Sequence, residues 1–127
     1  MPPNVRLHGV VERGRLLELL AEADVGLGTL VLHRKDLSEA SPLKLREYVA
    51  VGLPVVYAHV DPDIDRLGTL ALRIPNNATN IADNLDRISD FVEHARGKRV
   101  PRAVLGHIAA SAKESQRLQL FELLARD

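Results

Sequence analysis

One stretch of this chain constrains its fold more than any other, because it joins a helix start, a helix end and the strand that follows. Ser41-Pro42 is a strong start signal: serine caps helices, and proline suits the first helical position, where its missing N–H costs nothing. Gly52 is a typical helix end, and the mostly apolar residues 54–60 directly after it are typical of a strand. A helix that leads at once into an apolar strand favours a layered α/β fold.

The same alternation continues along the chain. Apolar segments predict four strands, at residues 5–11, 25–32, 54–60 and 70–74. Apolar residues at helical spacing predict four helices, at residues 14–24, 42–51, 81–95 and about 104–124. The nearly continuous hydrophobicity of 25–32 suits a strand that is covered on both faces. We therefore expect an α/β fold with a mostly parallel sheet of about four strands flanked by helices.

Composition narrows the classes of function. The chain has 127 residues, a formal net charge of zero and 3% aromatic residues. Neutrality argues against sequence-blind nucleic-acid binding, which needs excess basic charge, and the few aromatics argue against base stacking. The absence of cysteine excludes disulfides, thiolate metal sites and cysteine nucleophiles. No apolar run approaches the roughly 20 residues that span a bilayer, and no signal peptide is recognisable, so a cytoplasmic location is expected.

Two glutamates mark the candidate site. Glu39 precedes the helix at 42–51 and Glu47 lies inside it, eight positions later. The backbone amides of Leu43 and Lys44 point out of the helix start, and with the helix dipole they favour an anion. In open α/β sheets such helix starts gather beyond the carboxyl ends of the strands, where ligands bind. Two carboxylates beside an anion site suit a sugar joined to a diphosphate, with Glu47 placed for the vicinal hydroxyls of a ribose. The alternative is a capped helix with a solvated glutamate, since short spacings recur by chance.

The order of these elements resembles the C-terminal, donor-binding half of retaining glycosyltransferases of the GT-B fold, in particular the group 1 or family 4-like enzymes. The most specific part is a Glu-x7-Glu pattern with the family's ending, here Glu39, a short loop, and Glu47-Tyr48-Val49-Ala50-Val51-Gly52-Leu53-Pro54-Val55-Val56. The resemblance extends from about residue 5 to the C-terminus. It implies an incomplete Rossmann-like domain that binds a nucleotide-diphosphate sugar for retaining hexosyl transfer.

The resemblance also implies roles for five residues. Glu39, the candidate catalytic residue, would bind hydroxyls of the donor sugar, and the amides of Ser41 and Leu43 would face the diphosphate. Glu47 would hold the ribose, and Val11 would contact the nucleobase through its backbone. The family implies no metal and no cofactor besides the donor substrate, because the leaving diphosphate assists a front-face displacement. The chain departs from the family in the loop, where Ala-Ser-Pro replaces Gly-Phe-Gly and the proline removes one amide.

Further parts of such enzymes are missing from this chain. Family members have an N-terminal acceptor domain and two more strands, with a basic pair, at the start of the second domain. Only four residues precede Val5, so we expect residues 1–127 to be a partial domain without transfer activity of its own. The strand at 5–11 would lack its neighbours and must pair elsewhere, pair with another chain, or fray. The expected partners are therefore the missing domain, another chain, or a second copy joined through an exposed strand edge.

Other features of the sequence are weaker candidates. Residues 61–65, Asp-Pro-Asp-Ile-Asp, contain the Asp-x-Asp that another glycosyltransferase fold uses for metal and diphosphate, but a solvated loop or a helix cap is expected here. The five histidines lack metal-ligand spacing, so surface or hydrogen-bonded histidines are expected. Lys98, Arg99 and Arg102 support at most a peripheral membrane contact. The alternative function is a noncatalytic α/β module that acts through association with itself or another chain, with the last helix as a docking helix.

Overall fold

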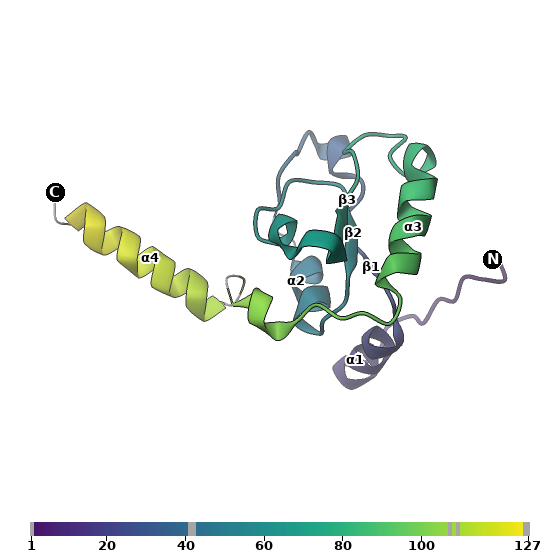
Figure 1. Cartoon of the computed structure of the whole chain (residues 1–127), viewed down its shortest axis with the longest axis horizontal. Coiled ribbons are helices and arrows are strands. Elements are labelled where there is room, and N and C mark those ends of the chain that lie inside the picture. The colour runs from purple at the N-terminus through teal and green to yellow at the C-terminus, as the bar shows by residue number, and fades with distance from the viewer. Residues whose placement is uncertain (1, 41–42, 107, 109, 126–127) are drawn as a thin grey trace.

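The computed structural model describes residues 2–40, 43–106, 108 and 110–125. At its centre is a small open sheet of three parallel strands in the order β1-β2-β3 (Figure 1). The strands are β1 (Gly26–Leu27), β2 (Val55–Tyr57) and β3 (Ala71–Arg73). The α-helices are α1 (Arg13–Glu22), α2 (Leu43–Ala50), α3 (Leu85–Ala95) and α4 (Ala110–Ala125). Short 3-10 helices occupy connections: η1 (Leu32–Lys35), η2 (Ile64–Leu70), η3 (Ala82–Asn84) and η4 (Arg102–Leu105).

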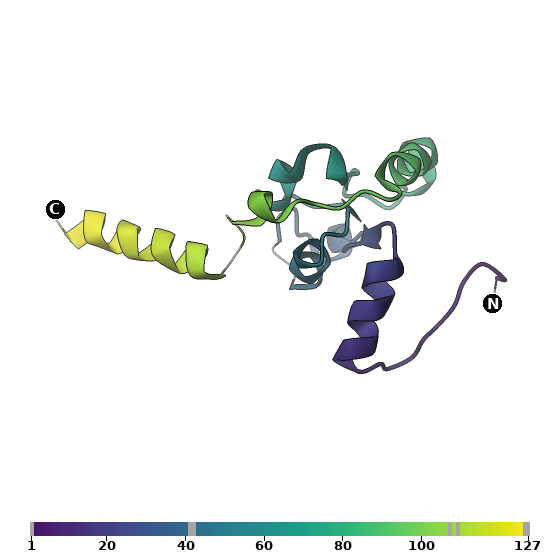
Figure 2. The same ribbon diagram turned by 60° about the horizontal axis from the view of Figure 1, so that its bottom comes forward.

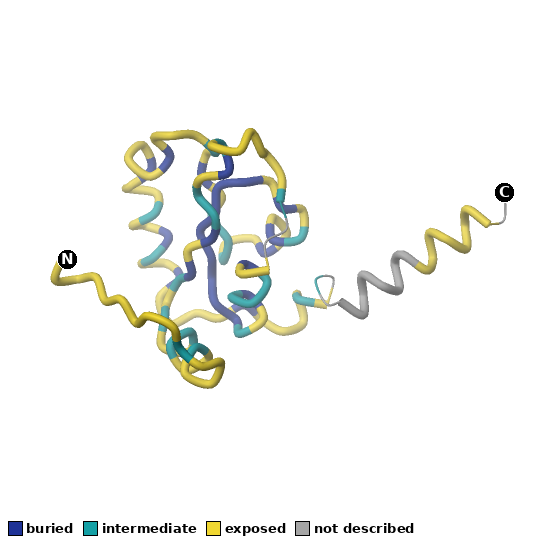
Figure 3. The backbone as a smooth tube through the Cα atoms, turned by 180° about the vertical axis from the view of Figure 1, so that it is seen from behind, coloured by how far each residue is buried: buried dark blue, intermediate teal, exposed yellow. Residues whose placement is uncertain are grey.

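Strand β2 is the centre of the core because it is buried on both faces. Val55 and Tyr57 pack in a cluster with residues of α2 and η2, whereas Val56 packs in a second cluster with residues of α3. Figure 1 shows α2 and α3 on opposite sides of the sheet, and Figure 3 shows the buried residues concentrated between them. The result is a helix–sheet–helix sandwich, which agrees with the α/β class and the parallel sheet predicted from the sequence.

Two glycines allow α2 to take its place against the sheet. Gly52 has a positive φ of 84° and ends α2 as predicted, and the N–H of Leu53 then donates to the carbonyl of Tyr48 at 3.0 Å. Gly26 in β1 lies directly under the ring of Tyr48, where an added Cβ would stand 2.6 Å from a ring carbon. The lack of a side chain at Gly26 therefore sets how closely α2 approaches β1.

The predicted first strand, at residues 5–11, does not form. Leu7 is 76% exposed, Val10 is fully exposed, and a positive φ of 67° at Gly9 interrupts the extended backbone. Figures 1 and 2 show this N-terminal segment running away from the body of the molecule. Among the described residues no strand lies beside it, and a strand without a partner cannot satisfy its backbone hydrogen bonds except with water. The sheet therefore has three described strands rather than four.

The strand predicted at 25–32 is also different. β1 itself is short, although pairing continues as far as Thr29, whose carbonyl accepts from the N–H of Ala58 at 3.2 Å. The expectation that both faces are covered was wrong, because Leu27 is 55% exposed on one face of β1. In the described sheet β1 is also an edge strand.

The last helix begins at Ala110 instead of about 104, since η4 forms a separate turn before it. Both views of the ribbon show α4 extending away from the sandwich (Figures 1 and 2). Each described side chain from Leu118 to Ala125 is exposed. In the described part of the chain, the end of the expected docking helix therefore packs against no other element.

Candidate functional site

Glu39 lies at the carboxyl edge of the sheet. Its backbone forms an isolated parallel bridge with Val60, three residues beyond the end of β2. The N–H of Ala40 donates to the carbonyl of Val60 at 3.1 Å, and the N–H of Val60 donates to the carbonyl of Ser38 at 2.8 Å. The backbone of Glu39 is therefore held while its side chain is exposed to solvent. This edge is where open parallel sheets bind ligands.

Glu47 lies in the middle of α2, and its side chain is 40% exposed. Its Oε1 is 3.7 Å from a guanidinium nitrogen of Arg13, in the first turn of α1. The two residues are too exposed for this pair to contribute much stability. The pair instead places the start of α1 near Glu47. Val11, which is partly buried and two residues before Arg13, comes near Glu47 with it. Burial and, to a smaller extent, the charge of Glu47 raise the pKa of the neighbouring Tyr48.

The start of α2 is the third part of the predicted site. Leu43 is the first residue of the helix and is 73% exposed. Among the described residues, no acidic side chain in the first turn of α2 compensates the positive end of the helix dipole. The predicted diphosphate ligand Ser41 lies outside the described residues.

The structure reveals a buried ion pair that sequence reasoning missed. Asp61 is fully buried, and its two carboxylate oxygens accept hydrogen bonds from two nitrogens of Arg46, with Nη2 to Oδ1 at 2.8 Å. The same Nη2 donates to Asp63 at 3.2 Å, and the side chain of Arg46 is only 17% exposed. The hydrogen bond to Asp61 is the largest cause that raises the pKa of Arg46, against the opposing effect of burial.

The expectation of a solvated loop at residues 61–65 was therefore wrong for Asp61, while the expectation of a helix cap was closer. Asp61 accepts from the N–H of Ile64 at 3.4 Å, at the start of η2. A signal was present in the sequence: this aspartate directly follows a long apolar run, where an acidic side chain needs a cationic partner. The position of that partner on α2 depended on the fold.

This ion pair connects the two candidate carboxylates. Arg46 is adjacent to Glu47 in α2, and Asp61 is adjacent to Val60, which bridges to Glu39. Helix α2 and the loop after β2 are thereby joined by a short, charge-assisted contact. Glu39 and Glu47 are consequently linked through this contact, although neither touches the other in any contact of the described residues.

A cavity of about 240 Å³ lies next to Glu39, beyond the carboxyl ends of β2 and β3. Ser38, which precedes Glu39, and Val60, its bridge partner, are part of its wall. Its polar lining includes Arg73, which pairs with Asp65 at 3.0 Å. The cavity could hold a group about the size of a sugar ring, with hydrogen-bonding side chains on several sides.

Two other polar side chains line the same cavity. Asn76 is held in place, because its amide donates to the carbonyl of Leu37 at 2.7 Å and its oxygen accepts from the N–H of His33 at 2.8 Å. His59 is 2% exposed, and its Nε2 has no hydrogen-bond partner among the described residues. The prediction of surface or hydrogen-bonded histidines holds for the Nδ1 of His59, which lies 3.4 Å from the carbonyl oxygen of Val60, and was wrong for its Nε2.

Neither a metal cluster nor a membrane-spanning helix is found in the described ranges. No group of three or more histidine, aspartate or glutamate side chains there is arranged to hold a metal ion. None of the helices in those ranges has the length and hydropathy needed to cross a bilayer. No protein-family model matches the chain, and no curated protein or solved structure matches it. A function for this chain must therefore be argued from the geometry of its own residues.

Proposed function

We propose that this chain binds a nucleoside-diphosphate sugar at the carboxyl edge of its sheet, as the donor-binding, Rossmann-like part of a retaining glycosyltransferase of the GT-B type. One observation carries the proposal. The ion pair of Arg46 with Asp61 links α2, which contains Glu47, to the loop after β2, which pairs with the backbone of Glu39. Two solvent-facing carboxylates linked in this way are suited to binding hydroxyls at two places on one ligand.

Each part of the ligand has a place in this arrangement. The sugar enters the cavity whose wall includes Ser38, the residue before Glu39. The exposed carboxylate of Glu39 is not part of that wall, and in this proposal it accepts hydrogen bonds from hydroxyls of the sugar on the solvent side. The diphosphate faces the amide of Leu43 and the positive end of the α2 dipole. Glu47 accepts both hydroxyls of the ribose, and the base lies against the backbone near Val11. In this proposal Arg13, whose guanidinium is 3.7 Å from Glu47, releases that carboxylate when the ribose binds.

The proposed chemistry needs no nucleophile from the protein. An acceptor hydroxyl attacks the anomeric carbon on the side that the diphosphate leaves. The bond from that carbon to the diphosphate oxygen breaks, and the proton of the hydroxyl passes to the leaving phosphate. The chain's share in this reaction is to bind and orient the donor. The acceptor would come from a separate domain or chain.

The proposal is tested by an NMR titration of the isotope-labelled chain with UDP, GDP and ADP. We expect one nucleotide to shift the amides of Val11, Leu43 and Glu47. Loss of a hydrogen bond to a charged group costs about 1.5–3 kcal/mol, so Glu47→Gln should weaken binding by about ten-fold or more. The matched control is Glu93→Gln on α3, an exposed glutamate that pairs with Arg96 at 3.5 Å. If no nucleotide shifts these amides, or if both variants bind equally well, the proposal is wrong.

The alternative of a noncatalytic module that acts by association also has an observation in its favour. Large apolar side chains are exposed both in the N-terminal segment and on α4. This alternative does not need Glu47. It would be supported if the chain binds none of the three nucleotides but associates with itself or with another chain.

A further inference from the structure

Asn76, three residues after the end of β3, clamps the loop that leads to Glu39. Its side-chain oxygen accepts from the N–H of His33 at 2.8 Å, and its side-chain nitrogen donates to the carbonyl of Leu37 at 2.7 Å. His33 lies in η1 and Leu37 lies just beyond it, so one amide group holds this segment at two points. A carboxylate of the same shape accepts but cannot donate, whereas an amide carries both functions.

The clamp spans a residue with an uncommon backbone conformation. Asp36, between His33 and Leu37, has a positive φ of 53°, which is uncommon outside glycine. Such a conformation is maintained when the surrounding structure holds the residues on either side. The two hydrogen bonds of Asn76 provide this support, because they fix the segment before and after Asp36.

Glu39 lies between this clamp and a second anchor. Leu37, two residues before Glu39, is held by Asn76, whereas the residues directly before and after Glu39 bond through their backbone to Val60. The bridge to Val60 is an isolated one, so by itself it fixes the loop at one place only. The clamp adds a second place, and a loop that is ordered in advance lowers the free-energy cost of binding a ligand.

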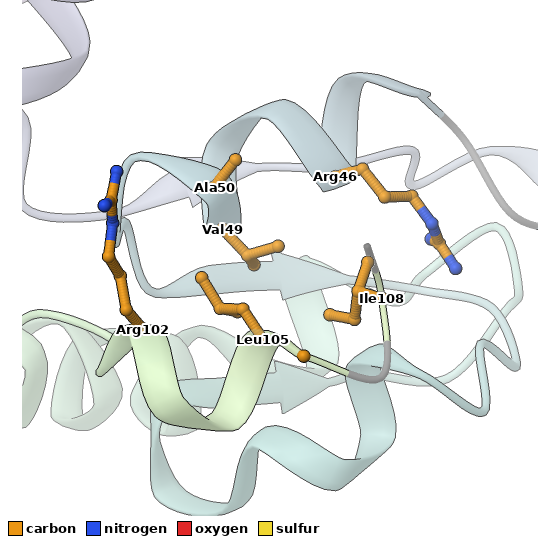
Figure 4. Close-up of a pocket in the computed structure, with 7 residues that line it drawn as sticks. Arg46, Val49, Ala50, Arg102, Leu105 and Ile108 are labelled. Atoms are coloured by element: carbon orange, nitrogen blue, oxygen red, sulfur yellow. The ribbon is translucent and has the colours of Figure 1, made fainter. Parts of the chain in front are cut away.

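Asn76 is also part of the wall of the cavity of about 240 Å³ at the carboxyl edge of the sheet. The proposed function places the sugar there and the ribose near Glu47, on α2. The cavity of about 380 Å³ between α2 and η4 is different in kind, because its lining side chains are apolar apart from Arg46 and Arg102 (Figure 4). A sugar needs hydrogen-bonding groups in fixed positions, so the cavity with the clamped amide suits it better.

We infer that Asn76 is a positioning residue for the sugar of the donor. It fixes the backbone of Glu39, so that the carboxylate meets the sugar hydroxyls in a prearranged position. This inference rests on the proposed function, and it adds that the sugar and the nucleotide depend on different residues. Loss of the clamp should weaken the binding of a nucleotide sugar and leave the binding of the free nucleotide unchanged.

Isothermal titration calorimetry on the full chain tests this with three ligand pairs: UDP and UDP-glucose, GDP and GDP-mannose, and ADP and ADP-glucose. For the pair that binds, Asn76→Asp should raise the dissociation constant of the nucleotide sugar about three- to ten-fold, which is the effect of about one hydrogen bond. The dissociation constant of the nucleotide should stay as it is. Far-UV circular dichroism of each variant establishes that the sandwich remains folded.

Asn77→Asp is the matched control, because it brings the same charge to the neighbouring position. Asn77 accepts from the N–H and the hydroxyl of Thr79, which an aspartate also does, and it does not line the cavity. Both dissociation constants should therefore stay unchanged in this variant.

A double-variant cycle separates positioning from direct contact with the sugar. Asn76→Ala removes both hydrogen bonds without adding charge, and it should weaken the binding of the nucleotide sugar much less when Glu39→Ala is already present. An equal loss with and without Glu39→Ala would show that Asn76 binds the sugar itself, and the positioning role would be wrong.

The outcomes also separate this inference from the proposed function. If the unaltered chain binds a ligand pair, and the Asn76 variants weaken both members equally or neither, this inference is wrong while the proposed function stands. If the unaltered chain binds none of the six ligands, the proposed function fails and this inference fails with it.

Discussion

Replacing Asp61 by asparagine should destabilise the protein far more than any substitution of an exposed carboxylate. The asparagine keeps the shape of the side chain but removes the charge that Arg46 neutralises in a fully buried position. Breaking a buried ion pair from one side typically costs about 3–5 kcal/mol. Arg46 is 17% exposed and keeps Asp63 at 3.2 Å, so part of its charge stays compensated. The expected loss in the free energy of unfolding is therefore about 2–3 kcal/mol, a large share of the roughly 5–15 kcal/mol of a typical domain.

The assay is equilibrium unfolding in urea, followed by far-UV circular dichroism. The control is Glu18→Gln, because Glu18 pairs with Arg15 at 3.0 Å on the exposed surface of α1 and should change stability by less than about 0.5 kcal/mol. The double variant Arg46→Met with Asp61→Asn should lose less than the sum of the two single variants, since each single change leaves a polar partner uncompensated. An Asp61→Asn protein as stable as the Glu18→Gln protein would refute this account of the ion pair.

Three further changes have expected outcomes. Burial, followed by the hydrogen bond and charge of Asp65, raises the pKa of Tyr57, so the folded state holds this proton more tightly than the unfolded state. The contribution of Tyr57 to stability should therefore be constant below about pH 10, the ordinary tyrosine value, and fall above it. In urea unfolding at several pH values above about 10, Tyr57→Phe should flatten the fall of the unfolding free energy with pH. An unchanged slope of that free energy against pH would contradict this account. Gly26→Ala should cost about 1–3 kcal/mol of unfolding free energy through its clash with Tyr48; a loss under about 0.5 kcal/mol would show that α2 moves freely. Gly14→Ala, in α1 with no atom near the added Cβ, should leave stability unchanged or raise it by up to about 1 kcal/mol, and a loss would contradict this.

The elements that the sequence predicted correctly depend on local signals. Helix α2 ends at the glycine that was expected to end it. Elements α3, β2 and β3 lie within the ranges predicted from apolar spacing, and α1 begins just before its predicted range. Periodicity and glycine conformation act within a few residues of the chain, so they can be read without knowing what packs where. The position of Glu47 within α2 followed from the same local pattern, whereas Glu39 is placed beyond β2 by a bridge to Val60, twenty-one residues later in the chain.

The predictions that failed concern groups whose state depends on a distant partner. Residues 5–11 have the composition of a strand, but a strand exists only beside another strand, and none is next to them in the described chain. Asp61 was expected in a solvated loop, but it is buried and forms an ion pair with Arg46, fifteen residues earlier in the chain. Thus the sequence by itself determined approximately where α1, α2, α3, β2 and β3 lie, and that Glu39 precedes α2 while Glu47 lies within it. Only the tertiary structure decided which segments found a neighbour, because hydrogen bonds between strands and the neutralisation of a buried charge are made between residues that the fold alone brings together.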